Sequence, residues 1–526
     1  MIEKQVISKN ELGGILANRM ARIGYGPESK KIQGKEINDG IVLQQRISVP
    51  YDTFIQSLVF DDCIFNQQVD LGDYEQAGAV RFYNCIFNNI VKIQLSNSSL
   101  SRDCIFNSDL IIQLKQGSVA EISDYNVKGK LQVYGPTGFG TSQQKLFLKD
   151  INRNQEIKDQ KVEIGGEFGD IIVEGVFGNI MEFRNDTTVH REFAVERTHI
   201  SSLIIGRLVL NTEMAVASCK IQNLQIGNTI GARRGLKISD SFIEKIELQM
   251  NVLLRLSILE SSINNLMLVD VNTDDSILSI EKTTISNLRF ERMFNKGLIT
   301  IKELNIPANG IVSFKSSNLG KADFIYCDFS KATLEFENSK ITESFFSETE
   351  FPKKVLVNGR RNYGQAQLAF GQLATAFQKQ GDSIRALEYN SRELEAHYKN
   401  IRLFSSHFFQ KINLWLNAIS NNFGRNWFLG IVFSFGIGLL FFCLLLISTD
   451  KYGWGFPHFD FKLMPAYLKF MNPLRFFELE ALFNNTPQEG VIKLGGRSYL
   501  ADFFGRVFVA YGYYQTIQAF RRFGRK

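Results

Sequence analysis

The sequence contains few prolines and few histidines, and no known catalytic motif stands out in it. Nine prolines in 526 residues are too few for a disordered or proline-rich chain. The five histidines are scattered, and no nucleophile–base pair or paired-carboxylate motif accompanies them. The glycine-rich stretch 163–178 lacks the G-x-x-x-x-G-K-[ST] pattern of a phosphate loop. We therefore expect no catalytic residues and no cofactor, and we do not expect an enzyme.

Paired cysteines and a secretory signal are also missing. None of the six cysteines belongs to a C-x-x-C pair, which argues against a zinc site or thioredoxin-like chemistry. The N-terminal stretch MIEKQVISKNELGGIL lacks the apolar core of a secretory signal. We therefore expect the large N-terminal part to stay in the cytosol with its thiols reduced. Its export by a later membrane helix is the alternative.

The charge balance is mildly basic, with a formal net charge of +6. No clustered basic stripe with interleaved aromatic residues stands out, so a nucleic-acid partner is not expected. Basic residues beside a membrane segment more often set topology or contact anionic lipids.

One long apolar run, Trp427 to Ser448, is present. It carries no charged residue, and as a helix it would be about 33 Å long, which matches the hydrocarbon core of a bilayer. A buried helix of a soluble domain is the alternative, although such a helix usually keeps a polar stripe. The run predicts a transmembrane span, and a lipid bilayer as a partner.

The part before this run repeats itself. Three segments read DCIFN, NCIFN and DCIFN, and their cysteines stand at positions 63, 85 and 104. Four later isoleucines, at positions 221, 243, 263 and 285, recur at a similar interval. A repeat of about 20 residues is the length of one turn of a parallel β-helix. The matching positions of the three segments, which we expect inside that β-helix, are Cys63, Phe65, Cys85, Phe87, Cys104 and Phe106.

The stretch SSNLGKADFIYCDFSKATLEF is the most regular. Large apolar residues recur every five positions, at Leu319, Phe324, Phe329 and Leu334, and small residues, Ser317, Ala322, Cys327 and Ala332, stand two positions before them. In an extended segment, positions i and i+2 share a face. Five residues can therefore form one side of a square coil, with both residues of each pair, Cys327 included, inside.

This stretch resembles the pentapeptide-repeat family, whose fold is a right-handed quadrilateral β-helix. The strict five-residue pattern holds only over about residues 317–334, and the three C-x-F units are further echoes of it. Between them the pattern is looser, which predicts a less regular parallel β-helix there. The resemblance implies interior ladders of reduced, unreactive cysteines.

After Pro352 the apolar period changes from 2 to about 3.6, which predicts two helices that meet near Gly381 and Asp382. The stretch LATAFQKQGDSIRALEYNSRELE resembles one tetratricopeptide helical hairpin. A single copy cannot bury its face alone, so we expect it to cap the β-helix or to mediate assembly. Residues 404–426 are aromatic and amphipathic, as in a helix that lies at a membrane interface.

Residues 502–520 form a second candidate span, although their uncharged core, 507–520, is shorter than a bilayer crossing normally needs. On a helix, one face would carry the candidate pore-facing or bundle-facing residues Asp502, Arg506, Tyr513 and Thr516. An interfacial amphipathic helix is the alternative. We favour a second span because it returns the C-terminus to the side of the β-helix. The basic residues expected at the cytoplasmic membrane surface are Arg521, Arg522, Arg525 and Lys526.

These segments predict a mainly β solenoid followed by an α-helical hairpin and a C-terminal α-helical transmembrane region. The expected domains are an N-terminal cap (1–46), a parallel β-helix (47–358), a helical hairpin with an interfacial lead-in (362–426) and a transmembrane region (427–526). The C-terminal layout resembles bacterial membrane proteins that join pentapeptide repeats to a two-span, ion-channel-like domain. The resemblance implies the bacterial inner membrane, although no T-V-G-Y-G-like filter lies between the spans.

Two functions remain open. The first is an oligomeric channel-like or membrane-permeabilising protein that the cytosolic β-helix controls; because two helices cannot enclose a pore, it requires a homo-oligomer. The second is a non-conducting, membrane-tethered scaffold whose β-helix surface binds a protein partner.

Overall fold

A computed structural model gives the fold of the chain. It describes residues 5–17, 20–22, 30–42, 53–55, 58–72, 80–95, 98–99, 103–136, 144–153, 160–206, 208–227, 235–249, 255–269, 272–273, 277–352, 355–357, 360–402, 406–449, 463–475, 479, 482–483 and 495–524. The chain forms two compact units, Met1–Lys353 and Lys354–Lys526. Each unit is described below by itself.

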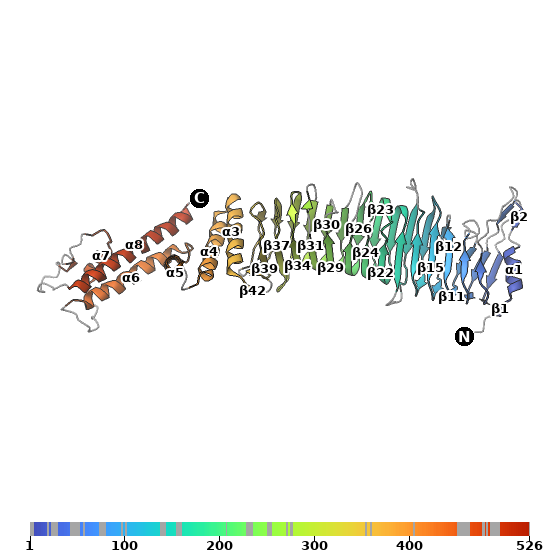
Figure 1. Ribbon diagram of the computed structural model, residues 1–526, viewed down its shortest axis with the longest axis horizontal. Helices are drawn as coiled ribbons and strands as arrows, with labels where there is room; N and C mark the ends of the chain where they lie inside the picture. The colour runs from blue at the N-terminus through green and yellow to red at the C-terminus, as the bar shows by residue number, and fades with distance from the viewer. Residues whose placement is uncertain are drawn as a thin grey trace. The chain divides into compact units, whose positions relative to one another are not determined.

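The first unit is a parallel β-solenoid of about 11 turns (Figure 1). Its longest ladder contains, in spatial order, β39 (Thr333–Glu337), β37 (Ile311–Lys315), β34 (Thr284–Glu291), β31 (Ser262–Val269), β29 (Phe242–Gln249), β27 (Lys220–Ile226), β24 (His199–Ile205), β22 (Phe177–Phe183), β20 (Lys161–Gly165), β18 (Leu131–Tyr134), β15 (Leu110–Leu114), β12 (Val91–Leu95), β9 (Val69–Leu71) and β5 (Ile41–Val42). The prediction of a β-solenoid followed by C-terminal helices, one of them apolar, is confirmed.

A second parallel ladder runs beside the first. It contains, in spatial order, β13 (Ser98–Ser99), β16 (Val119–Ser123), β19 (Lys145–Lys149), β21 (Glu167–Glu174), β23 (Thr188–Glu196), β26 (Glu213–Ala217), β28 (Gly235–Ser239), β30 (Arg255–Leu259), β33 (Ile277–Glu281), β36 (Leu298–Lys302), β38 (Ala322–Ile325) and β40 (Phe345–Ser347), with β25 (Val209–Leu210) beside β23. Several strands, such as β23 and β27, are longer than one five-residue side. The strict square coil therefore does not extend through this region.

Shorter ladders occupy the N-terminal turns. One contains β1 (Gln5–Ile7), β4 (Lys35–Ile37), β8 (Ile64–Phe65), β11 (Ile86–Phe87), β14 (Ile105–Phe106) and β17 (Asn126–Val127). The other short elements are β3 (Lys30–Gln33), β7 (Leu58–Asp61) and β10 (Val80–Tyr83) in one sheet, the antiparallel pair β2 (Met20–Arg22) and β6 (Thr53–Ile55), the pair β32 (Asn272–Thr273) and β35 (Phe294–Asn295), and the helix α1 (Lys9–Ala17). Strands within residues 1–46, the predicted cap, thus already belong to the parallel ladders.

Period-2 alternation explains these strands. In β15, Leu110, Ile112 and Leu114 are buried, and the residues between them face outward. The residues predicted to lie inside are each at most 3% exposed: Cys63, Phe65, Cys85, Phe87, Cys104, Phe106, Leu319, Phe324, Cys327, Phe329 and Leu334. Phe87 stacks between the rings of Phe65 and Phe106, with centroid distances of 4.7 and 4.8 Å. The spacing of the three C-x-F segments therefore places equivalent side chains on top of one another.

Left-handed backbone residues mark a corner in successive turns. Strands of the second ladder are followed directly by residues with positive φ, among them Asp124, Asp150, Arg197, Ser218, Asp240, Glu260, Lys282, Glu303, Tyr326 and Glu348. Most of these are neither Gly, Asn nor Asp, so the backbone conformation is costly for them. From Asp124 to Tyr326, the N–H of each of these corner residues donates to a carbonyl in the next turn: Ser218 N–H donates to Ser239 O (3.0 Å) and Asp240 N–H to Leu259 O (3.2 Å). Backbone hydrogen bonds between successive turns thus stabilise the left-handed conformation at the corners.

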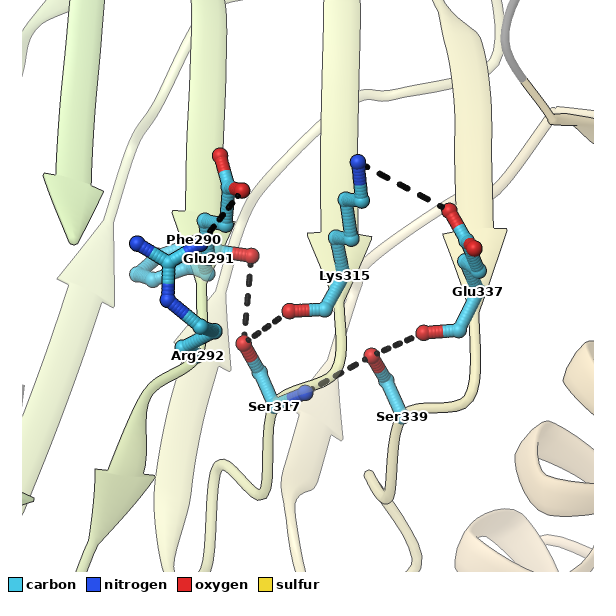
Figure 2. A network of polar contacts seen from close by, with 7 residues as sticks. All are labelled: Phe290, Glu291, Arg292, Lys315, Ser317, Glu337 and Ser339. Carbon is cyan, nitrogen blue, oxygen red and sulfur yellow. Dashed lines mark hydrogen bonds and ion pairs between the residues drawn. The ribbon is translucent and has the colours of Figure 1, made fainter. Parts of the chain in front are cut away.

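Small polar residues follow the corners and form an internal ladder. In Figure 2, the Ser317 hydroxyl donates to the carbonyl of Lys315 (2.8 Å), and the Ser317 N–H donates to the Ser339 hydroxyl of the next turn (3.1 Å). Cys219 occupies an equivalent corner position, with its sulfur 3.2 Å from the carbonyl of Ala217. Burial raises the pKa of Cys219 and of Cys327 to about 11, so both thiols stay protonated at neutral pH.

The second unit begins with a short antiparallel pair, β41 (Val355–Val357) and β42 (Arg360–Arg361), and is otherwise helical. Its helices are α3 (Tyr363–Lys379), α4 (Ser383–Asn400), α5 (Phe408–Asn421), α6 (Trp427–Ile447), α7 (Met464–Phe470) and α8 (Gly496–Gly524). The predicted helical hairpin is α3 and α4. Its turn contains Gly381 at a φ of +82°, and the rings of Phe377 and Tyr389 stack at 5.3 Å.

Candidate functional site: a charge cluster inside a helical hairpin

Helices α6 and α8 run antiparallel along their full common length. At one end, the rings of Trp427 and Phe520 lie 6.0 Å apart. At the other end, the hydroxyl of Ser448 donates to the hydroxyl of Ser498 at 2.8 Å. The side chain of Asn426 caps the start of α6 by accepting hydrogen bonds from two backbone N–H groups. The two predicted spans therefore form one hairpin, which we call the α6–α8 hairpin.

Small residues form the seam of the α6–α8 hairpin. Gly430, Ser434 and Gly438 recur every four residues on α6, and all three are buried. A Cβ on Gly430 would collide with Thr516, and one on Gly512 would collide with Ser434. Such small-residue seams let membrane helices approach closely. Sequence analysis missed this seam, although the G-x-x-x-S-x-x-x-G spacing is visible in the sequence.

The outward face of the α6–α8 hairpin is apolar. The exposed large residues of α6 include Phe428, Val432, Phe435, Leu439, Leu440 and Leu444. Those of α8 include Leu500, Phe503, Phe504, Val507, Tyr514, Ile517 and Phe520. Asp502 and Arg506, in contrast, are only 1% and 7% exposed, while the neighbouring Phe503 is 51% exposed. Helix α8 thus has the reverse polarity of a helix on a water-soluble domain.

Three charged side chains meet inside the hairpin. The Asp502 carboxylate accepts a hydrogen bond from Arg506 Nε at 2.8 Å, and its other oxygen pairs with the guanidinium of Arg475. Arg506 Nη1 also donates to the backbone carbonyl of Arg475 at 2.6 Å. The guanidinium of Arg475 lies over the ring of Phe470, 4.9 Å from its centroid. One carboxylate therefore serves two guanidinium groups, and the cluster carries a formal charge of +1.

Sequence analysis predicted Asp502 and Arg506 but missed Arg475. Arg475 lies in the connecting segment, far ahead of Asp502 in the sequence, so no helical spacing indicates the contact. Two of its nitrogens, Nε and Nη1, are buried without a hydrogen-bond partner among the described residues.

Tyr513 and Thr516, the other two residues of the predicted face, also contact the chain's own interior. The hydroxyl of Tyr513 donates to the carbonyl of Met471 at 3.1 Å. The hydroxyl of Thr516 donates to the carbonyl of Gly512, one turn earlier in its own helix, at 2.8 Å. Within one chain, the predicted face therefore lines a packed interior.

The connecting segment packs against the α6–α8 hairpin through α7. The Tyr467 hydroxyl donates to the carbonyl of Phe435 at 2.7 Å, and the rings of Tyr467 and Phe470 lie 5.6 Å from that of Phe442. Pro465 stands in the first turn of α7, where its missing N–H does no harm. Helix α7 thus reaches the middle of α6 and places Phe470 beside the charge cluster.

Helix α5, the predicted interfacial lead-in, carries an exposed apolar stripe at helical spacing, which includes Phe409, Ile412, Trp415 and Ile419. Its opposite side joins the hairpin, because the buried Asn421 amide donates to Gln515 Oε1 at 2.7 Å. In the basic tail, Arg521 is exposed in the last turn of α8. The side chain of Arg522 and residues Arg525 and Lys526 lie outside the described residues.

Within the described ranges, one helix, α6, is long and apolar enough to cross a membrane. In the same ranges, no group of three or more His, Cys, Asp or Glu side chains is placed to hold a metal ion. Comparison with protein-family models, with curated proteins and with solved structures finds no match to the chain.

Proposed function

We propose that the protein is a membrane-anchored β-solenoid scaffold. In this proposal the α6–α8 hairpin crosses the bilayer twice, and the solenoid surface binds a protein partner. The observation that carries the proposal is the reversed polarity of α8: Asp502 and Arg506 are buried and paired, and the surrounding face is apolar. An apolar outer face suits lipid, whereas a pore-lining helix would present its polar groups to a water path.

In this proposal α8 is the second span although its composition alone is not apolar enough. The pairing of Asp502 with the two arginines lowers the cost of burying these charges, and it leaves the exposed side of α8 between residues 498 and 520 free of charge. The double crossing returns the basic tail to the side of the solenoid, as the enrichment of Lys and Arg on the cytoplasmic side requires. On the basis of the sequence resemblance, we further propose that the membrane is a bacterial inner membrane, that the solenoid is cytosolic and that the protein is related to pentapeptide-repeat proteins.

An oligomeric permeability path is the second candidate function. The net positive charge cluster within the hairpin favours it, together with the two Arg475 nitrogens that lack partners among the described residues. If several hairpins associate and the cluster rearranges toward a shared axis, these groups would face the path.

Ion flux from liposomes distinguishes the two functions. The full-length protein is reconstituted next to Arg506→Ala and next to a variant that ends at Asp450, and insertion is verified by resistance to alkaline extraction. The scaffold proposal expects inserted full-length protein with no flux above that of protein-free liposomes. Flux that is lost in both variants would contradict the scaffold and establish the permeability path.

A further inference from the structure

The α3–α4 hairpin contains a polar groove of about 490 Å³ that the proposed function does not use. Residues that line it include Gln367, Leu368, Gly371, Gln372, Thr375 and Glu393. All but Glu393 lie on one face of α3, and Glu393 reaches the groove from α4. The groove therefore combines one carboxylate with amide and hydroxyl groups and one apolar side chain.

Glu393 differs from the other carboxylates of α4. Glu388 pairs with Arg392 at 2.6 Å, and Glu395 pairs with Lys399 at 2.6 Å. Glu393 is partly buried and has no hydrogen bond or ion pair with any described residue. Burial raises the pKa of this carboxyl above its usual range, since no cation compensates for the lost water. A partly buried carboxylate without a cationic partner in its own chain can pair with a cation from another molecule.

The carboxylate of Glu393 lies close against α3 at one side of the groove. Gly371 faces the carboxylate, and a Cβ at this position would come within 3.0 to 3.2 Å of its carboxyl atoms. The oxygen of Gln367 is held by His397 Nδ1 at 3.0 Å, so this side of the groove has a fixed position. Leu368 is 42% exposed and provides an apolar wall. The combination suits a charged head on an alkyl stem.

We propose that the groove binds an alkylammonium group, with Glu393 as its counter-ion and Leu368 against its stem. The charge-assisted hydrogen bond to a partly buried carboxylate provides affinity, and the apolar stem adds contact area. The same group occurs in free amines and in the lysine side chains of a protein. This site is separate from the α6–α8 hairpin, so its failure would leave the proposed anchor unaffected.

A ligand-observed NMR titration of the full-length protein in nanodiscs tests this site. The two probes are cadaverine and the capped peptide Gly-Ser-Leu-Lys-Ser-Gly, and tighter binding of one or the other assigns the source of the group. We expect saturable binding of at least one probe. Glu393→Gln, which keeps the shape of the side chain, should weaken it at least tenfold, and Gly371→Ala should weaken it about threefold because the methyl group displaces the carboxylate.

Glu395→Gln is the matched control, since it removes a carboxylate from the same helix outside the groove. Its binding should equal that of the unaltered protein. Circular dichroism of each variant confirms that the helices are retained. Absence of saturable binding of both probes, or unchanged binding in Glu393→Gln, would overturn the proposal. Equal weakening in Glu395→Gln would also overturn it, because the effect would then be a general one of charge.

Discussion

The solenoid and the α6–α8 hairpin distribute the same residue types in opposite ways. In the solenoid, Phe324 and Phe329 are fully buried, and charged residues such as Lys321 face outward. In the hairpin, Phe503 faces outward, and Asp502 is buried with its arginine partners. Water dictates the first arrangement through the hydrophobic effect. The second arrangement lowers the free energy only where the outside is itself apolar, which is why the comparison supports a lipid environment.

The two regions also hold polar groups in their interiors differently. The solenoid repeats one small device, a Ser, Thr or Cys that bonds to a backbone carbonyl near its corner, turn after turn. The hairpin contains a single charge cluster, which is not repeated among its described residues. A substitution at one solenoid corner therefore removes one of many similar hydrogen bonds. A substitution in the charge cluster removes a contact that no other described residue of the hairpin repeats.

The largest expected effect follows from Asp502→Ala. It leaves two guanidinium groups inside the hairpin without their shared carboxylate, and we expect a loss of about 3–5 kcal/mol in stability. Thermal unfolding in detergent, followed by far-ultraviolet circular dichroism so that both strands and helices are observed, measures it. Glu335→Ala on the solenoid surface is the control and should change stability by less than about 0.5 kcal/mol. Equal losses of stability in both variants would contradict the claim that the buried charge cluster stabilises the hairpin more than a surface charge stabilises the solenoid.

Phenylalanine truncation sharpens the comparison directly. Phe324→Ala should destabilise the solenoid by about 3–5 kcal/mol, because a fully buried ring leaves a cavity. Phe503→Ala should cost less than about 0.5 kcal/mol in detergent or lipid, because its ring exchanges one apolar environment for another. Denaturant unfolding of the two variants provides both values. A loss of several kcal/mol for Phe503→Ala would mean that this ring packs within the protein.

Alanine at two glycines of α6 tests the seam. Gly430→Ala should destabilise the hairpin by about 1–3 kcal/mol, because the added methyl group collides with Thr516. Gly436 is exposed on the same helix and has nothing within contact distance, so Gly436→Ala should be neutral or slightly stabilising. Thermal melts in the same detergent compare them. If both variants behave alike, close packing of α6 on α8 is not what holds the hairpin.

The smallest expected effect concerns Glu393. Burial raises the pKa of its carboxyl in the folded state above the unfolded value, so the stability of the neutral form is present below the unfolded pKa and is lost as pH rises through the folded pKa. Glu393→Gln removes this loss of stability, because the amide stays uncharged at every pH. We expect its melting temperature to exceed that of the unaltered protein by about 1–3 °C at pH 7.5 and to equal it at pH 3.5. Glu388→Gln, which breaks an ion pair, should show no such rise.

Much of the solenoid could be predicted from the sequence because its turns stack at nearly equal spacing. The C-x-F segments identify residues that indeed lie one above the other, such as Phe65 and Phe87. Corner geometry could not be predicted, because residues such as Tyr326 and Lys282 adopt positive φ against their own preference and are held by the neighbouring turn. Likewise, the strand lengths depend on pairing across turns, which the five-residue pattern does not contain.

The hairpin was predictable only in part. Asp502 and Arg506 are four residues apart, so helical spacing alone brings them together. Arg475 enters the cluster from a separate segment through tertiary packing, and a single sequence carries no signal for such a contact. The groove at Glu393 also arises from tertiary packing, because it depends on which residues of α3 face α4. It could therefore not be predicted from the sequence either.

Accessibility of introduced cysteines in sealed vesicles tests most directly whether the hairpin crosses the membrane twice. With Cys443 replaced by Ala, single cysteines are introduced at Lys321 on the solenoid, at the 91% exposed Leu474 of the connecting segment and at Gly524 at the end of α8. They are labelled with a membrane-impermeant maleimide before and after the vesicles are opened. We predict that Lys321→Cys and Gly524→Cys react from one side and Leu474→Cys from the other. Reaction of all three from the same side would contradict the double crossing.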